Sequence, residues 1–120
     1  MKRRIGRRER RRLYRIVREI YGLFNYGEWH VKYARIRYNY RLCEKEEIPL
    51  DRVGFYDLDT KLFWVDYRYD ILDTLVHECL HVLYPDLAEY EICSLTKWVM
   101  NNMSRAQAKH VIEHVNHFLV

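Results

Sequence analysis

Glycine and proline are scarce in this chain of 120 residues, which has four glycines and only two prolines, Pro49 and Pro85. No stretch rich in Gly, Ser or Pro separates one part of the chain from another, and no segment repeats. These absences argue against flexible linkers and repeat arrays. The length suits one domain that spans residues 1–120.

Cysteines and long apolar runs are scarce as well. Cys43, Cys79 and Cys93 form no C-x-x-C pair, which argues against a disulfide framework and for free thiols in a reducing compartment. No apolar run approaches the roughly 20 residues that cross a bilayer, and the N-terminus shows no apolar signal-peptide core. We therefore expect a cytoplasmic protein with no membrane partner, and the oligomeric state, including a homo-oligomer, is left open.

Acidic residues are nearly missing from the N-terminus. Residues 1–18 hold ten Lys or Arg and one Glu, whereas the other 102 residues hold eleven Lys or Arg and sixteen Asp or Glu. The basic segment 1–12 has almost no apolar residues, and an apolar helical stripe begins at Leu13. Two interpretations stay open: phosphate contacts with nucleic acid, or a solvated helix that covers the sheet.

Hydrophobic periodicity predicts a small α+β domain with the order helix, three strands, three helices. The expected elements are a helix over 7–24, a strand over 28–42 broken near Ala34, a charged loop over 43–52, a hairpin over 53–67, a helix over 70–84, a helix over 86–103 and a helix from Ser104 to the C-terminus. Asp70 is the expected N-cap of the helix over 70–84, and Pro85 ends it.

The pattern His77-Glu78-Cys79-Leu80-His81 lies in the middle of this helix. Residues four apart share one helix face, so His77 and His81 can hold a single zinc ion. Glu78 is offset by one position, from which it can act as a general base on a water held by the ion. The alternative is a core helix whose two histidines are satisfied by other partners.

A catalytic zinc site needs a third protein ligand, and Glu89 and Glu91 are the candidates. Both reach the right height if the helix after Pro85 turns back alongside the histidines. On a helical wheel Glu91 falls inside the apolar arc and Glu89 falls outside it. We therefore predict Glu91 as the third ligand, with Glu89 as the alternate and as a surface charge at the helix N-terminus.

These residues carry a resemblance to a known family. The stretch 54–92, with "GFYDLDTKLFWVD" before "TLVHECLHVLYPDLAEYEI", resembles the core of gluzincin-type zinc metallopeptidases, and among them the minimal minigluzincins. The resemblance covers roughly residues 53–99. It implies an active-site helix, a third-ligand helix and one zinc ion per chain. One departure is Ser94-Leu95, where related proteins often have Ala-Asp after the third-ligand Glu.

The resemblance also implies where a peptide binds and how activity is controlled. The strand before the active-site helix is expected to lie along the cleft as an edge strand, so its residues are candidates for binding an extended peptide: Lys61, Leu62, Phe63, Trp64 and Val65. The C-terminal segment is expected to block the cleft in a latent, zymogen-like form. The histidines His110, His114 and His117 are either part of such a plug or second metal site, or a polar helix face.

The leading hypothesis is a zinc metallopeptidase that hydrolyses peptide bonds by Glu-assisted attack of a zinc-bound water. A further hydrogen-bond donor to the reacting carbonyl is needed, for which Tyr84 and the C-terminal histidines are candidates. Two alternatives remain. One is a nucleic-acid-binding protein with a structural zinc site and an Arg-rich N-terminus, and the other is an interaction protein with an inactive site.

Overall fold

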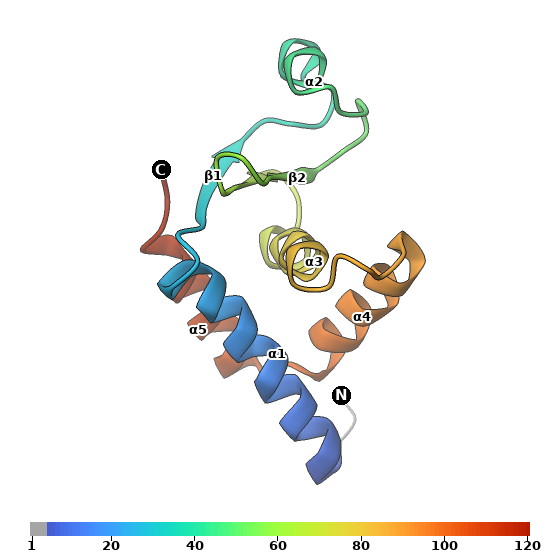
Figure 1. Ribbon diagram of the computed structural model, residues 1–120, viewed down its shortest axis with the longest axis vertical. Helices are drawn as coiled ribbons and strands as arrows, with labels where there is room; N and C mark the ends of the chain where they lie inside the picture. The colour runs from blue at the N-terminus through green and yellow to red at the C-terminus, as the bar shows by residue number, and fades with distance from the viewer. Residues whose placement is uncertain (1–4) are drawn as a thin grey trace.

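Five helices and three strands make up residues 5–120, the part of the chain that the computed structural model describes (Figure 1). In chain order they are α1 (Arg7–Asn25), β1 (His30–Ala34), α2 (Tyr40–Glu46), β2 (Gly54–Asp57), β3 (Leu62–Asp66), α3 (Ile71–Leu83), α4 (Glu89–Asn102) and α5 (Arg105–Asn116). The predicted α+β class is confirmed. Half of the predicted basic segment 1–12, residues 7–12, belongs to α1, and its residues 1–4 lie outside the described part. No helix in the described part is long and apolar enough to cross a membrane.

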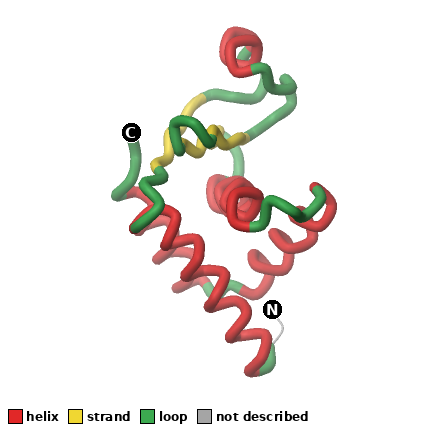
Figure 2. Tube along the Cα trace, viewed as in Figure 1, coloured by secondary structure: helices red, strands yellow, loops and turns green. Residues whose placement is uncertain are grey.

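The three strands, yellow in Figure 2, form one mixed sheet. Their order in the sheet is β1-β3-β2, so β3 is the central strand. β3 pairs in parallel with β1, where Val31 lies opposite Phe63, and antiparallel with β2, where Gly54 lies opposite Val65. The predicted hairpin is confirmed. The prediction that residues 61–65 form an edge strand is wrong, because neighbouring strands occupy both hydrogen-bonding sides of β3.

The outer edge of β1 is covered by the C-terminal residues. The Val31 amide donates to the Phe118 carbonyl, the Val120 amide donates to the Val31 carbonyl, and both bonds are 3.0 Å long. The end of the chain therefore extends the sheet beyond β1, on the side away from β2, as Figure 1 shows by the position of the C-terminus. Within residues 5–120 no strand pairs with the outer edge of β2.

Residues 36–42 are not the strand that their alternating apolar pattern predicts. β1 ends at Ala34, and Tyr38 adopts a left-handed backbone conformation with φ of 59°. Asn39 then caps α2, and its side chain accepts a hydrogen bond from the Leu42 amide at 3.1 Å. Capping of a helix N-terminus satisfies an amide that has no partner inside the helix, so it favours a helix at this point.

A buried carboxylate, Asp66, ties the end of β3 to the loop that follows β1. Its side chain is fully buried and accepts hydrogen bonds from the amides of Ile36, Arg37 and Arg68 and from the Arg68 guanidinium. The hydrogen bonds from Arg68 lower the pKa of Asp66 strongly, and they outweigh the opposing effect of burial. This network fixes the loop that carries the chain from the sheet to α2.

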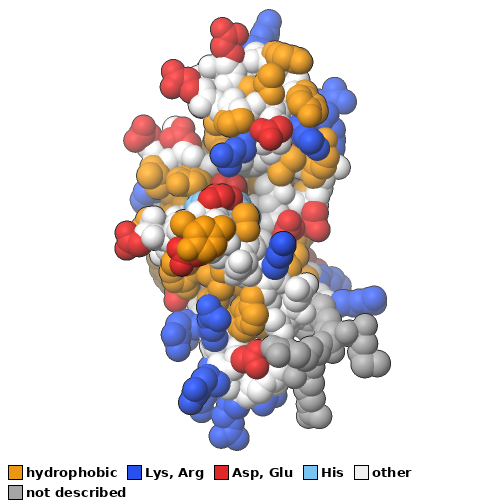
Figure 3. Space-filling view, turned by 90° about the vertical axis from the view of Figure 1, so that its right-hand side faces the viewer, with side chains coloured by type: hydrophobic (Ala, Val, Ile, Leu, Met, Phe, Trp, Pro, Cys, Tyr) orange, Lys and Arg blue, Asp and Glu red, His pale blue; other side chains and the backbone are white. Residues whose placement is uncertain are grey.

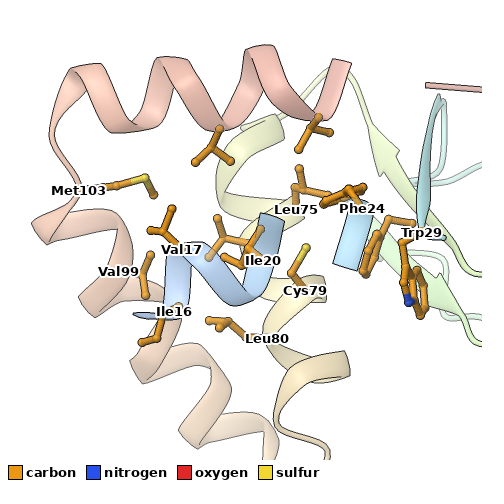
Figure 4. Packing of buried hydrophobic residues seen from close by; sticks show 14 of the residues in the cluster. Ile16, Val17, Ile20, Phe24, Trp29, Leu75, Cys79, Leu80, Val99 and Met103 are labelled. Carbon is orange, nitrogen blue, oxygen red and sulfur yellow. The ribbon is translucent and has the colours of Figure 1, made fainter. Parts of the chain in front are cut away.

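Helix α3 is the centre of the packing, in contact with α1, α4 and the sheet. The buried residues of α1 recur three and four positions apart, which gives the helix one apolar stripe: Leu13, Ile16, Val17, Ile20 and Phe24. In Figure 4 this stripe faces Leu75, Cys79 and Leu80 of α3. The helix that carries the H-E-x-x-H pattern thus packs against α1, and it also contacts α4 and β2.

Candidate metal centre

His77 and His81 project from the same face of α3. The helix begins where the Asp70 side chain accepts a hydrogen bond from the Asp73 amide at 3.1 Å, and it ends at Leu83, two residues before Pro85. The Nε2 atoms of the two histidines lie 3.2 Å apart. Two ligand atoms at 2.0–2.1 Å from a tetrahedral zinc ion would be separated by about 3.3 Å. The spacing of the two imidazoles therefore fits one shared ion.

Glu89, the first residue of α4, completes the group. Its Oε1 lies 2.9 Å from His77 Nε2, and its Oε2 lies 2.7 Å from His81 Nε2. Burial disfavours the ionised carboxylate, but His77 and His81 outweigh this effect and lower the pKa of Glu89. Burial lowers the pKa of His81, which favours the neutral imidazole that a metal requires. The three side chains thus offer two nitrogens and a carboxylate, a donor set that zinc accepts.

Glu91 does not lie beside the histidines, so its predicted place at the site is corrected. Its Oε1 accepts a hydrogen bond from the Ala88 amide at 3.0 Å, as the third residue of a helix that Ala88 caps. The helical wheel favours Glu91 because its apolar arc includes Ala88 and is measured from Leu87, although both residues precede α4. It also leaves Thr96 outside that arc, although Thr96 is buried. With those changes the buried arc of α4 lies closer to Glu89. The two glutamates have exchanged their expected roles.

Thr96 orients the ring of His77. The Thr96 hydroxyl donates to the Ile92 carbonyl at 2.8 Å, and its oxygen lies 3.4 Å from His77 Nδ1. Since the hydroxyl proton is already used, the oxygen can only accept from a protonated Nδ1. The neutral His77 then has a free lone pair on Nε2, toward His81 and Glu89. Metal-binding histidines typically donate their second ring N–H to such a partner. Thr96 can serve here although Leu95 stands where related proteins often have an Asp.

Cys93 lies on the outer side of the same group. Its thiol donates to Glu89 Oε1 at 3.5 Å, one helical turn further along α4. Ligand atoms of His77, Glu89 and Cys93 all lie within 4.8 Å of one another. The structure therefore offers two overlapping donor sets, one with His81 and one with Cys93. The set with His81 has the shorter separations, between 2.7 and 3.2 Å.

Glu78 is almost completely buried, with 5% of its surface exposed. Burial raises its pKa to about 7, the positive charge of Arg52 opposes this shift, and the negative charge of Glu89 adds to it. The residue lines a cavity of about 540 Å³ together with His77 and Glu89. A carboxylate with a pKa near neutrality can take up a proton and return it, which is what a general base and acid must do.

Strand β2 approaches α3 closely beside this cavity. A Cβ atom at Gly54 would clash with Thr74 Cγ2 and would lie 3.1 Å from the Trp64 carbonyl oxygen and 3.7 Å from Glu78 Cγ. Glycine is therefore required for the distance between the strand and the helix. β2 lines the cavity through Gly54, and none of the lining residues belongs to β3.

Arg52 is the functional candidate that the sequence pattern did not reveal. It lines the cavity described above and an adjoining one that contains His81, and its positive charge acts on both Glu78 and His81. In the sequence it is one charged residue in an expected loop. No local sequence pattern distinguishes Arg52, because its position beside α3 depends on the tertiary structure.

The donors expected from the sequence lie elsewhere. The Tyr84 hydroxyl donates to Glu19 of α1 at 2.9 Å, and His114 Nε2 lies 2.8 Å from Asn25 Oδ1. Neither residue lines the cavity, and neither do the described residues after Asn102. The expected plug therefore does not occupy this site: the C-terminal segment lies at the opposite edge of the sheet.

The candidate centre is accessible from outside. Figure 3 shows histidine surface flanked by acidic side chains on the face that carries the helices α3 and α4. The Glu89 side chain is 57% exposed, whereas those of His77 and His81 are 20% and 18% exposed.

Comparison of the chain with models of protein families, with curated proteins and with solved structures gave no match. The interpretation of the site therefore depends on its geometry and chemistry.

Proposed function

We propose that this protein is a zinc-dependent metallopeptidase whose ion is held by His77, His81 and Glu89. One observation carries the proposal: side-chain atoms from two helices converge at separations of 2.7–3.2 Å beside a buried carboxylate with a pKa near neutrality. In the H-E-x-x-H pattern of zinc peptidases, the glutamate at the position of Glu78 serves as the general base. An ion pair between Glu89 and two histidines would have no need of a second carboxylate beside it.

The residues of the chain have distinct roles in this proposal. When bound, zinc would acidify a water and polarise the carbonyl of the peptide bond. Glu78 accepts a proton from the attacking water as its oxygen bonds to the carbonyl carbon, and it then delivers that proton to the nitrogen as the C–N bond breaks. Arg52, on the cavity wall, offers N–H donors to the negative charge that develops on the carbonyl oxygen.

The substrate is expected to bind as an extended strand. Gly54 of β2 lines the cavity, and the outer edge of β2 has no partner strand in the described part of the chain. Backbone groups at such an edge can pair with an added peptide strand. Since all three cysteines are free, a reducing, cytoplasmic location forms part of the proposal.

The test combines metal content with cleavage. Native mass spectrometry of protein purified without added metal is expected to show one zinc ion per chain in the wild type and in Glu78→Gln. A mixed peptide library is expected to be cleaved by the wild type only, while Arg52→Gln keeps its zinc and cleaves more slowly. The exposed Glu113→Gln is the matched control and is expected to cleave normally.

The outcomes separate the alternatives. Zinc without cleavage of any peptide would favour a structural ion or an inactive site over a peptidase. A chain that contains no zinc and does not take it up from solution would contradict the metal site itself.

A further inference from the structure

The exposed face of α1 carries arginines on the side opposite its buried stripe. With 100° per residue, Arg11, Arg15 and Arg18 fall within about 60° of one another, and the centre of this arc lies roughly opposite the buried residues. All three side chains are exposed. In Figure 3 basic side chains gather at the lower end of the molecule, the end where α1 begins in Figure 1. The helix thus presents a basic ridge to solvent.

The placement of this charge is unfavourable for the helix alone. Seven arginines and one glutamate lie within residues 7–18, the N-terminal two thirds of α1. The N-terminus of a helix has a partial positive charge, so cations there are disfavoured, and neighbouring cations repel each other. No ion pair among residues 5–120 includes Arg11, Arg15 or Arg18. An anionic ligand would remove this repulsion.

Two exposed tyrosines accompany these arginines. Tyr14 and Tyr26 are 61% and 88% exposed, and they line one groove along α1 with Arg11, Arg15 and Arg18. Glu19 and Gly22 complete the lining of this groove. The Arg18 guanidinium lies over the Tyr14 ring, 5.7 Å from its centre. From Arg11 to Tyr26 the groove extends about 22 Å at 1.5 Å per residue.

We infer that this groove binds single-stranded nucleic acid. Arg11, Arg15 and Arg18 contact the phosphates, and Tyr14 and Tyr26 provide surfaces on which bases stack. A duplex would offer phosphates only, because its bases are already stacked. An anionic membrane is disfavoured because membrane-surface helices insert large apolar side chains, and the apolar stripe of α1 is buried in the core.

The groove is separate from the candidate metal centre. The residues that line it belong to α1 or, in the case of Tyr26, cap its C-terminus, whereas the cavity at Glu78 is lined by α3, β2, Glu89 and the loop before β2. Nucleic acid could therefore be bound while the cavity stays open to a peptide. The inference does not depend on the proposed peptidase activity.

The test is fluorescence anisotropy of the full chain with a labelled single-stranded pyrimidine oligonucleotide of about 20 residues. The variant Arg11→Gln/Arg15→Gln/Arg18→Gln removes three phosphate contacts. The slope of log association constant against log salt concentration is therefore expected to become less negative by about 2. The variant Tyr26→Ala is expected to lose at least about fivefold in affinity, since a stacked base contributes on this scale, with the salt slope unchanged.

The control variant removes the same charge elsewhere. Arg41→Gln/Lys45→Gln/Arg105→Gln changes three exposed cations on α2 and α5 and is expected to keep the wild-type slope and affinity within about a factor of two. Equal losses in both triple variants would show non-specific charge attraction and would overturn the inference. Tighter binding to duplex DNA, or to phosphatidylserine vesicles, would also overturn it. Circular dichroism of each variant verifies that the fold is intact.

Discussion

The assignment of Glu89, and not Glu91, to the candidate metal centre can be tested with one isosteric substitution at each position. Glu89→Gln removes the negative charge from a carboxylate whose two oxygens approach His77 and His81 at 2.9 and 2.7 Å. Glu91→Gln leaves an amide oxygen that can still accept from the Ala88 amide, because Gln and Glu serve equally at this capping position. The two substitutions are chemically identical and lie two residues apart on α4.

The expected difference in zinc affinity is large. Substitution of groups that only orient metal ligands costs about 10- to 100-fold in affinity. Loss of a ligating carboxylate should exceed this, so Glu89→Gln is expected to weaken zinc binding by more than about 100-fold, or about 2.7 kcal/mol. Glu91→Gln is expected to change zinc affinity less than about threefold, and it loses only the interaction of its charge with the helix dipole, about 0.3–1 kcal/mol of stability.

Competition with a fluorescent zinc chelator at constant pH measures both affinities. Thermal unfolding with and without zinc is an independent check, since zinc at 100 times its Kd should stabilise the folded chain by about 2.7 kcal/mol. A Glu91→Gln variant that loses zinc, beside a Glu89→Gln variant that keeps it, would refute the geometry described here. Unchanged affinity in both would refute a site with a glutamate ligand.

Further predictions concern the neighbours of the site and the fold around it. With cobalt in place of zinc, the wild type is expected to show visible ligand-field bands without a thiolate charge-transfer band; a charge-transfer band that disappears in Cys93→Ser would place Cys93 in the donor set. Asp66→Asn is expected to lower the free energy of unfolding in urea by about 3 kcal/mol, because it leaves the Arg68 guanidinium and the buried amides without a carboxylate; a change below about 1 kcal/mol would contradict the role of the network. Because the pKa of Asp66 is lowered on folding, its stabilisation is present above pH of about 4 and is lost as the pH falls further, so urea unfolding of the wild type between pH 5 and about 2 should show a steeper loss than Asp66→Asn shows. Gly54→Ala is expected to cost about 1–3 kcal/mol of stability through its clash with Thr74, and wild-type stability in that variant would show that β2 can move away from α3.

The sequence alone determined the local elements of this protein. The apolar stripe of α1, the Asp70 cap and Pro85 fix helices through contacts between residues close in the chain. The pairing of His77 with His81 follows from the same cause, because any α-helix places residues four apart on one face. A hairpin is local too, so β2 and β3 could be predicted with their turn.

Local patterns were misleading where two signals competed. Alternating apolar residues after Ala34 favoured a strand, but the Asn39 cap favoured a helix, and the network at Asp66 fixes the loop before it. The choice between strand and helix required knowing that Asp66, thirty residues from Ile36, accepts a hydrogen bond from the Ile36 amide.

Only the tertiary structure decided which residues complete the site. The position of β3 between β1 and β2 depends on a parallel pairing between distant segments, so it could not be read from the hairpin alone. Arg52 reaches the cavity through a loop that has no periodic pattern. Glu89 meets the histidines, and Glu91 does not, because α4 begins at Glu89 and because the Glu91 side chain accepts a hydrogen bond from the Ala88 amide. A shift of two residues in a helix rotates a side chain by about 200°, so the packing of α4 against α3 had to be known before the third side chain could be assigned.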